Sequence, residues 1–191
     1  RDLPLAKVPV VRLDRQYVQA RGGEGVQSLL SEKSAVLLGC GAVGSHLAGH
    51  LAGLGLGTLR LIDDERLDSD NIQRHALGIE YLGQNKATGL ARALGRHFPH
   101  QAFLARERKV EAVLQEEPEF IAEGHLVIMA LGEPTLERRV NGVLGLDRPH
   151  VHTWLEPLGV GGHVLVGGMG VPGCFECLFE ADAAAGLRNR A

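Results

Sequence analysis

The stretch Ser34-Ala-Val-Leu-Leu-Gly39-Cys-Gly41-Ala42-Val43-Gly44 decides the fold of this 191-residue chain. Residues 34–39 have the apolar character of a short buried strand, and residues 42–54 carry apolar side chains at helical spacing. Between them, Gly39 permits a tight turn, Gly41 lets a ligand approach the backbone, and Gly44 lets helix and strand pack closely. A strand, a glycine turn and a helix N-terminus with free N–H groups are typical of a nucleotide-binding loop. The candidate binding residues are therefore Gly39, Gly41, Ala42, Val43 and Gly44.

The same alternation continues outward from this loop. It predicts strands at residues 58–62, 101–106, 126–130 and 150–154, and helices at 83–98, 110–115 and 135–144. Residues 159–168 alternate without an intervening helix, which predicts antiparallel strands at the end of the sheet. The fold class is therefore α/β: a doubly wound, mostly parallel, Rossmann-like sheet with antiparallel strands at its C-terminal end. Residues 1–33 are expected to form an N-terminal arm with a short helix at 24–31, and residues 34–191 the nucleotide-binding domain.

Composition restricts the classes of function. The chain is 45% hydrophobic with a formal net charge of −3, which fits one globular domain. A general nucleic-acid or membrane surface would need a basic excess, so neither partner is expected. The chain shows no export signal and no apolar run near the ~20 residues that span a bilayer, so we expect a cytoplasmic protein. It begins at Arg1 rather than Met, and we interpret it as a fragment of a longer protein.

An acid at the end of the second predicted strand adds to the nucleotide-site prediction. Asp63 lies where a carboxylate can accept hydrogen bonds from both ribose hydroxyls. These features fit an NAD-binding oxidoreductase equally well. The cations of the next segment favour a triphosphate instead, because Arg74 offers a planar fork and Lys86 a point charge. We expect the Lys86 ammonium to lie in solvent or on a ligand.

The order of these motifs resembles the ThiF/MoeB-like, ubiquitin-activating adenylation family. The matching blocks cover nearly the whole chain: Arg15-Gln16, the glycine loop, Asp63-Asp-Glu65, Asn71-Ile-Gln-Arg74-His75, Gly83 to Ala87, and Cys174-x-x-Cys177. The resemblance implies ATP- and Mg²⁺-dependent adenylation of the C-terminal carboxylate of a ubiquitin-like or sulfur-carrier protein. It also implies a homodimer.

The resemblance assigns a role to individual residues. It implies that Asp63 holds the ribose and that Asn71, Arg74 and Lys86 hold phosphates, with Arg74 and Lys86 counted as catalytic. Glu65 would help with magnesium. Arg15 resembles the catalytic arginine that the family's dimers insert into the ATP site of the partner subunit.

One departure from the family pattern concerns magnesium. The family has an acid at the end of the fourth strand, and here that position falls on Gly132 in the run Ala130-Leu-Gly-Glu133-Pro134. Glu133 either substitutes for the acid or caps the following helix, where an acid is favourable in any case. A degenerate adaptor that binds a ubiquitin-like protein without activating it is therefore an alternative to the enzyme.

A second departure concerns the thiols. In the family, a pair such as Cys174 and Cys177 joins a second pair in a four-thiolate zinc site, and no cysteine follows Cys177 in this chain. We therefore expect half of a structural Zn²⁺ site, with a poorly anchored segment from Phe175 onward; a dithiol redox pair is the alternative. Many relatives transfer the activated protein to a cysteine later in the sequence, and this chain has no cysteine at such a position. Cys40 is expected to be a small packing residue.

The segment from Trp154 to His163 resembles a particular branch of the family. Trp154-Leu-Glu156-Pro followed by Gly161-Gly-His163 is similar to adenylation domains fused to, or encoded beside, ubiquitin-conjugating-like proteins in bacteria. Its glycines would let an extended substrate tail lie against the backbone. A glycine-rich antiparallel corner with no binding role explains the same residues.

Overall fold

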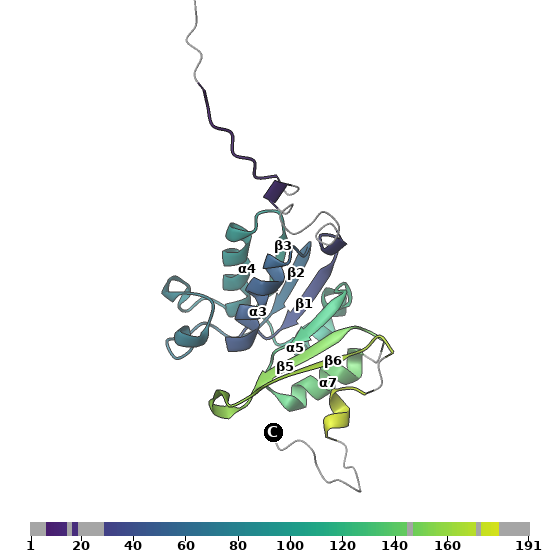
Figure 1. Cartoon of the computed structure of the whole chain (residues 1–191). Coiled ribbons are helices and arrows are strands. Elements are labelled where there is room, and N and C mark those ends of the chain that lie inside the picture. The colour runs from purple at the N-terminus through teal and green to yellow at the C-terminus, as the bar shows by residue number, and fades with distance from the viewer. Residues whose placement is uncertain (1–6, 15–16, 19–28, 145–146, 171–172, 180–191) are drawn as a thin grey trace, which may run out of the picture.

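A single six-stranded sheet organises the protein, as Figure 1 shows. The computed structural model describes residues 7–14, 17–18, 29–144, 147–170 and 173–179. The strands, in the spatial order β3-β2-β1-β4-β5-β6, are β1 (Ser34–Leu38), β2 (Thr58–Ile62), β3 (Ala102–Arg106), β4 (Leu126–Met129), β5 (His150–Leu155) and β6 (Gly162–Gly167).

Helices connect the strands in the expected alternation. They are α3 (Ala42–Gly53), α4 (Lys86–His97), α5 (Val110–Glu116), α6 (Pro118–Ala122) and α7 (Pro134–Leu144), with short 3₁₀ turns η2 (Ile72–Arg74), η3 (Ile79–Tyr81), η4 (Pro157–Gly159) and η5 (Phe175–Leu178). Helix α4 starts later than its apolar pattern indicates, because the Asn85 side chain caps it by accepting the Thr88 N–H at 3.0 Å. Helix α6 was not predicted. Of the predicted helix at 24–31, residues 24–28 lie outside the described part of the chain.

The sheet has the predicted doubly wound topology. All neighbouring strands from β3 to β5 are parallel, and β6 pairs antiparallel with β5. The strand order reverses between the neighbours β1 and β4, because the chain returns from β3 at one edge to place β4 beside β1. In open α/β sheets ligands bind at the carboxyl ends of the strands beside such a reversal.

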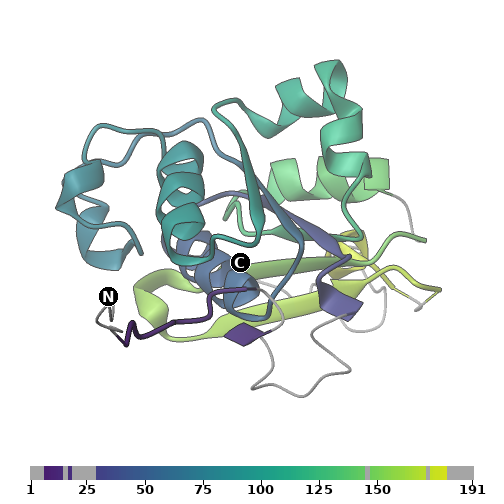
Figure 2. The ribbon, with the colours of Figure 1, turned by 90° about the horizontal axis from the view of Figure 1, so that it is seen from above.

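Apolar side chains on both faces of the sheet form two cores. Along β1, Ala35 and Leu37 belong to the core beneath α3 and α4, whereas Val36 and Leu38 belong to the core beneath α5, α6 and α7. All of β1 is buried, as expected for a central parallel strand with helices on both sides. Figure 2 shows the helices on the two sides of the sheet.

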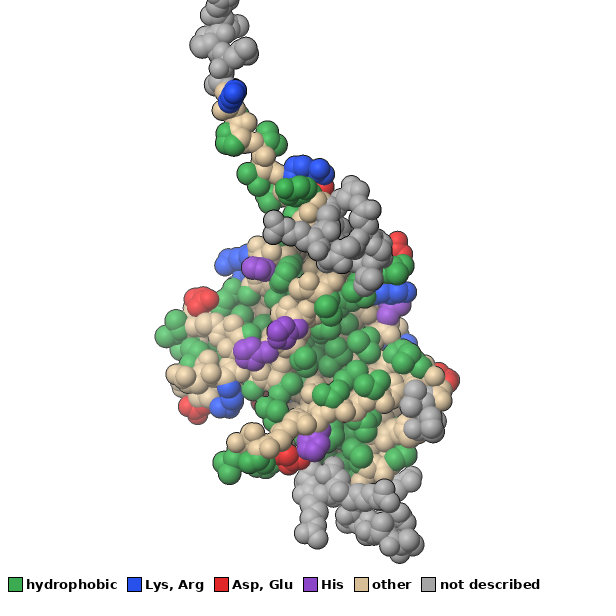
Figure 3. Space-filling view, viewed as in Figure 1, with side chains coloured by type: hydrophobic (Ala, Val, Ile, Leu, Met, Phe, Trp, Pro, Cys, Tyr) green, Lys and Arg blue, Asp and Glu red, His purple; other side chains and the backbone are tan. Residues whose placement is uncertain are grey.

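The β5–β6 end of the sheet is less completely covered. Val166 pairs with Val151, and Val164 pairs with Thr153, on the face that α3 covers farther along the sheet. Both valines are exposed, at 56% and 71%. Apolar surface is visible around this part of the molecule in Figure 3. Within the described residues no helix has the length and apolar character needed to cross a bilayer.

The glycine loop is packed too tightly for any side chain at two positions. A Cβ on Gly44 would lie 2.0 Å from the Gly39 carbonyl oxygen, and a Cβ on Gly39 would lie 2.6 Å from that of Ala130. Gly39 also has a φ of +87°, which favours glycine. The loop therefore joins β1, α3 and the end of β4 by direct backbone contact.

We predict opposite effects from two Gly→Ala substitutions in α3. Gly44→Ala should lower the free energy of unfolding by about 2–3 kcal/mol, because its methyl group would overlap rigid backbone. Gly49→Ala is the matched control: a Cβ there meets nothing within 4 Å. It should stabilise by about 0.5–1 kcal/mol through helix propensity. Urea denaturation measures both, and a Gly44→Ala protein as stable as the unsubstituted chain would contradict the packing argument.

Candidate functional site

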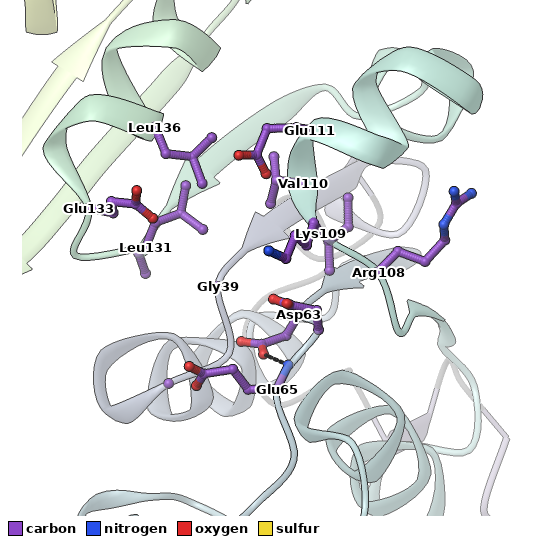
Figure 4. Close-up of a pocket in the computed structure, with 14 residues that line it drawn as sticks. Gly39, Asp63, Glu65, Arg108, Lys109, Val110, Glu111, Leu131, Glu133 and Leu136 are labelled. Carbon is purple, nitrogen blue, oxygen red and sulfur yellow. Dashed lines mark hydrogen bonds between the residues drawn. The ribbon is translucent and has the colours of Figure 1, made fainter.

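A cavity of about 380 Å³ opens at the carboxyl ends of the parallel strands, beside the reversal in strand order. Figure 4 shows its labelled side chains arranged around Asp63. The lining residues are Gly39, Gly41, Ile62, Asp63, Asp64, Glu65, Arg108, Lys109, Val110, Glu111, Ala130, Leu131, Glu133 and Leu136. Gly39 and Gly41 of the predicted glycine loop and the predicted acid Asp63 therefore border one cavity, whereas Ala42, Val43 and Gly44 are not among its lining residues.

The Asp63 carboxylate is held by the backbone around it. Its Oδ2 accepts the N–H of Cys40 at 2.6 Å, and its Oδ1 accepts the N–H of Glu65 at 2.8 Å. Burial raises the pKa of this carboxyl, although the two N–H donors and the nearby Lys86 oppose the shift. The side chain is thus fixed in the cavity between the glycine loop and the segment after β2.

The glycine loop presents the N-terminus of α3 without a capping side chain. Gly41 occupies the N-cap position and has no side chain that could accept the helix N–H groups, and a Cβ there would meet nothing within 4 Å. Open N–H groups and a positive helix end form an anion-binding arrangement. The cavity therefore combines a place for a phosphate with a place for a hydroxyl-bearing group.

His75 supports this loop from below and was not singled out by the sequence. Its Nδ1 accepts the Leu77 N–H at 3.0 Å, so its Nε2 carries the proton and donates to the Cys40 carbonyl at 2.7 Å. Burial lowers the pKa of His75, which favours this neutral form. Cys40 is fully buried, as expected of a packing residue, and burial raises the pKa of its thiol.

Lys86 is buried, contrary to the expected solvent-facing position. Its side chain is 3% exposed, and its ammonium pairs with the carboxylate of Glu65, which is 69% exposed. The reason is local pairing: the Leu67 N–H bonds to the Gln84 carbonyl and the Lys86 N–H to the Glu65 carbonyl, which places the two side chains together. Lys86 does not line the cavity, but Glu65 does.

Asn71 and Arg74 lie on the surface segment around η2. Arg74 is exposed and donates to the Asp70 carbonyl at 2.8 Å and to the Asn71 Oδ1 at 3.4 Å. Neither residue lines the cavity. Arg15 lies outside the described residues. Asn71, Arg74 and Lys86 were expected to hold phosphates, and none of the three lines the cavity in this structure.

The loop after β3 and the first turn of α5 contribute side chains that were not predicted from the sequence. Arg108, Lys109, Val110 and Glu111 all line the cavity. The signal was available, because parallel strands place their carboxyl ends at one edge and β3 pairs with β2. Arg108 pairs with Glu116 and Glu117, at 2.6 and 3.1 Å, and points away from the cavity in Figure 4.

The turn between β4 and α7 closes the cavity on the other side. Ala130, Leu131 and Glu133 line it, and Gly132 has a φ of +66°. The carboxylate of Glu133 is exposed at this wall, so an acid is present one residue after the position that the family pattern predicts.

The two later cysteines lie together near the surface. Their sulfur atoms are 3.8 Å apart, with Cys177 exposed and Cys174 partly exposed. The pKa of Cys174 is lowered: slight burial opposes ionisation, but hydrogen bonds from the Cys177 N–H and the Asn141 side chain outweigh it. Among the described residues no three metal-ligating side chains form a cluster.

The prediction of poor anchoring from Phe175 onward is wrong at its first residue. Phe175 is 3% exposed and stacks on His152, with ring centroids 4.1 Å apart. Aromatic burial holds this turn against β5. Residues 180–191 lie outside the described part.

Side chains at the β5–β6 hairpin form a separate group. Trp154 stacks on His163 with centroids 4.7 Å apart, and His163 Nε2 lies 2.7 Å from a carboxylate oxygen of Glu156. Trp154 also lines a smaller cavity of about 80 Å³ with Glu133, Phe175 and Phe179. The two cavities share Glu133.

Comparison with known proteins identifies the chain's relatives. Residues 13–190 match the ThiF family. The chain is 29% identical over 191 residues to the "ATP-dependent ubiquitin transferase-like protein Cap2" of Pseudomonas aeruginosa, covering 98% of this chain and 34% of that protein. It is 32% identical over 113 residues to "Adenylyltransferase and sulfurtransferase MOCS3" of Danio rerio, covering 56% of this chain and 25% of that protein. The chain thus spans about a third or less of these curated relatives.

Solved structures share the fold. An E. coli MccB structure with ATP superposes with a TM-score of 0.61 at 24% identity, covering 68% of this chain and 40% of that one. E. coli tRNA N6-threonylcarbamoyladenosine dehydratase, TcdA, in complex with AMP gives a TM-score of 0.62 at 23% identity, covering 75% and 62%. At these identities the likeness concerns the sheet and its helices.

Proposed function

The chain belongs to the ThiF family, and we propose that it adenylates the C-terminal carboxylate of a ubiquitin-like or sulfur-carrier protein with ATP and Mg²⁺. The observation that carries the proposal is the shared cavity. In it, the Asp63 carboxylate is fixed beside the open N-terminus of α3. The Asp63 carboxylate suits ribose hydroxyls, and the helix end suits phosphates.

The proposed reaction needs positioning more than covalent chemistry. A carboxylate oxygen of the substrate attacks the α-phosphorus of ATP, the bond to the bridging oxygen of pyrophosphate breaks, and pyrophosphate leaves with that electron pair. Fixed N–H groups and cations near the phosphates would stabilise the developing charge. The N–H groups belong to the glycine loop, and Lys86 lies close enough to affect the ionisation of both Cys40 and Asp63.

Magnesium would offset the charge of the triphosphate and order its oxygens. We propose Glu133 as its carboxylate ligand, because Glu133 lines the cavity and is exposed. Glu65 also lines the cavity, but its carboxylate already neutralises Lys86. Oxygen ligands of this kind are those that Mg²⁺ prefers.

The names of the relatives and the residues of the β5–β6 hairpin support the proposed class of substrate. The Cap2 relative is named as a ubiquitin transferase-like protein, and the MOCS3 relative as an adenylyltransferase and sulfurtransferase. We propose that an extended C-terminal tail approaches past the β5–β6 hairpin. Trp154 of the hairpin and Glu133 line the same smaller cavity, and Glu133 also lines the larger one. A flexible tail could reach the larger cavity along this side.

We predict that the chain binds Mg-ATP in preference to NAD in isothermal titration calorimetry. Lys86→Met should weaken ATP binding about tenfold, the loss of one charge-assisted contact. The fold should persist, because methionine fills the buried space and the remaining Glu65 carboxylate is mostly in solvent. Lys33→Met is the control, because Lys33 is exposed just before β1, at the end of the strand away from the cavity. Binding of NAD with no binding of ATP would contradict the proposed adenylating function and favour an oxidoreductase.

Pyrophosphate exchange separates an enzyme from an adaptor. Incubation with a panel of ubiquitin-like and sulfur-carrier proteins that end in Gly-Gly should give ATP–pyrophosphate exchange with at least one of them. A panel member that binds tightly without any exchange would support the adaptor alternative.

We also propose that the protein assembles as a two-fold homodimer through the face of β5 and β6 that carries the exposed Val164 and Val166. Val164 and Val166 continue the apolar surface of the α3 side of the sheet beyond the last helix that covers it. A second copy presenting the same strip would bury it, as isologous interfaces do. The proposed role of Arg15 in the partner's ATP site depends on this dimer.

Analytical ultracentrifugation tests the interface. The unsubstituted chain should sediment as a dimer, and Val166→Lys should make it a monomer, because a buried lysine would lack a partner. Val143→Lys is the control, since Val143 is 67% exposed on α7, on the other side of the sheet. A monomeric unsubstituted chain, or a Val166→Lys dimer, would refute this interface.

For Cys174 and Cys177 we propose a structural zinc site completed by ligands outside the described residues. The sulfur separation of 3.8 Å fits two corners of a tetrahedron. With Zn–S bonds near 2.3 Å those corners stand about 3.8 Å apart. A form of the protein extended past Ala191 should carry one zinc per chain by elemental analysis, and Cys174→Ser should remove it. Cys40→Ala should leave the zinc in place. An extended form with no zinc and both thiols open to alkylation would direct attention to a redox pair.

A further inference from the structure

The turn at residues 130–133 sets the shape of the nucleotide cavity on the side of the glycine loop. Ala130 and Leu131 line the cavity, and the Ala130 carbonyl oxygen would be 2.6 Å from a Cβ on Gly39. The turn therefore abuts the loop that leads into the N-terminus of α3, where an anion is favoured. A displacement of this turn would alter the phosphate end of the cavity and leave in place the end at Asp63, the residue that follows β2.

A buried acid holds this turn from beneath. Glu137 lies in the first turns of α7, its side chain is 2% exposed, and its Oε1 accepts the N–H of Gly132 at 3.2 Å. This contact reaches back across the start of the helix to the residue whose positive φ makes the turn. It fixes the Gly132 peptide relative to the body of α7.

The other oxygen of Glu137 is bound by a buried histidine from a different element. Oε2 lies 2.9 Å from Nδ1 of His152 on β5, and the His152 side chain is 0% exposed. Since the carboxylate accepts, Nδ1 carries the proton. Both oxygens of the acid are therefore satisfied, one from the turn and one from the sheet.

Aromatic packing fixes the histidine in turn. The His152 ring is stacked on Phe175 at 4.1 Å with an interplanar angle of 6°, and the edge of His150 meets it at 5.5 Å. Its Nε2 has no hydrogen-bond partner among the described residues. The imidazole thus has one polar function in this structure, which is to orient the Glu137 carboxylate.

A buried acid is a costly way to stabilise a helix. Removing a carboxylate from water costs free energy that its hydrogen bonds must offset, and an apolar side chain would pack against β5 without that cost. An apolar side chain could not hold the Gly132 N–H. The position of the turn is what the Glu137–His152 pair supplies.

We propose that Glu137, oriented by His152, is a positioning residue for the adenylation reaction that holds the Gly132 turn against the phosphate end of the cavity. The inference rests on the proposed ATP-binding function. It names residues outside the nucleotide cavity lining, since neither Glu137 nor His152 is part of that wall.

Calorimetry with Mg-ATP, and ligand-detected NMR with the weaker ligand adenosine, test the role. Glu137→Ala should weaken Mg-ATP binding about tenfold, the effect of losing a hydrogen bond to a charged group, and adenosine binding by less than about twofold. Glu137→Gln should recover most of the affinity, because its amide oxygen can accept from Gly132 and its NH₂ can donate to His152 Nδ1 once the imidazole proton moves to Nε2. His152→Phe, which keeps an aromatic ring on Phe175, should act in the direction of Glu137→Ala.

A control on the same helix separates positioning from stability. Val140→Ala should lower the midpoint of thermal unfolding through a core cavity, since Val140 is fully buried, and leave the ratio of ATP to adenosine affinity unchanged. If Glu137→Ala does not fold, His152→Phe and Glu137→Gln carry the comparison. Equal loss of both ligands, no loss of either, or a Gln variant as weak as Ala would overturn the positioning role alone. Absence of Mg-ATP binding by the unsubstituted chain would overturn the proposed function together with this role.

Discussion

The rest of the structure depends on the backbone contact between Gly39 and Gly44. A side chain on Gly44 would overlap the Gly39 carbonyl oxygen, so only glycine lets α3 start this close to the end of β1. The N-terminus of α3 therefore lies at the carboxyl ends of the strands. The same loop is pressed against Ala130, so the end of β4 is fixed to it. Two glycines thereby bring three elements to one point, and the cavity is the space that this convergence leaves.

Around that point, buried polar groups determine the position of the walls. Asp63 accepts the N–H of Cys40, His75 donates to the carbonyl of Cys40, and Glu137 accepts the N–H of Gly132. Each of these side chains is partly or wholly removed from water, so each carries a cost that its hydrogen bonds offset. Apolar packing builds the two cores of the domain, but these polar bonds orient the peptides that face the cavity.

The sequence predicted the fold nearly completely, because the relevant signals are local. The periodicity of 34–62 and the glycine spacing specify strand, turn and helix, and the absence of a helix before β6 indicated its antiparallel pairing. The site was predicted in part: the glycine loop and Asp63 do border one cavity. Lys86 and the Glu137–His152 pair could not be placed, because their environments depend on partners that lie 21 and 15 residues away and on the packing of separate elements.

The burial of Lys86 changes what a nucleotide would have to do on arrival. An exposed lysine is a bare cation that gains a counter-charge when phosphate binds, whereas this ammonium already has the Glu65 carboxylate. A phosphate that reaches Lys86 would compete with that carboxylate for the ammonium, so binding would involve two anions at one cation. The released Glu65 is mostly in solvent and can swing away without unfolding anything. In the proposed function, Lys86 would therefore have a counter-charge both before and after a phosphate binds.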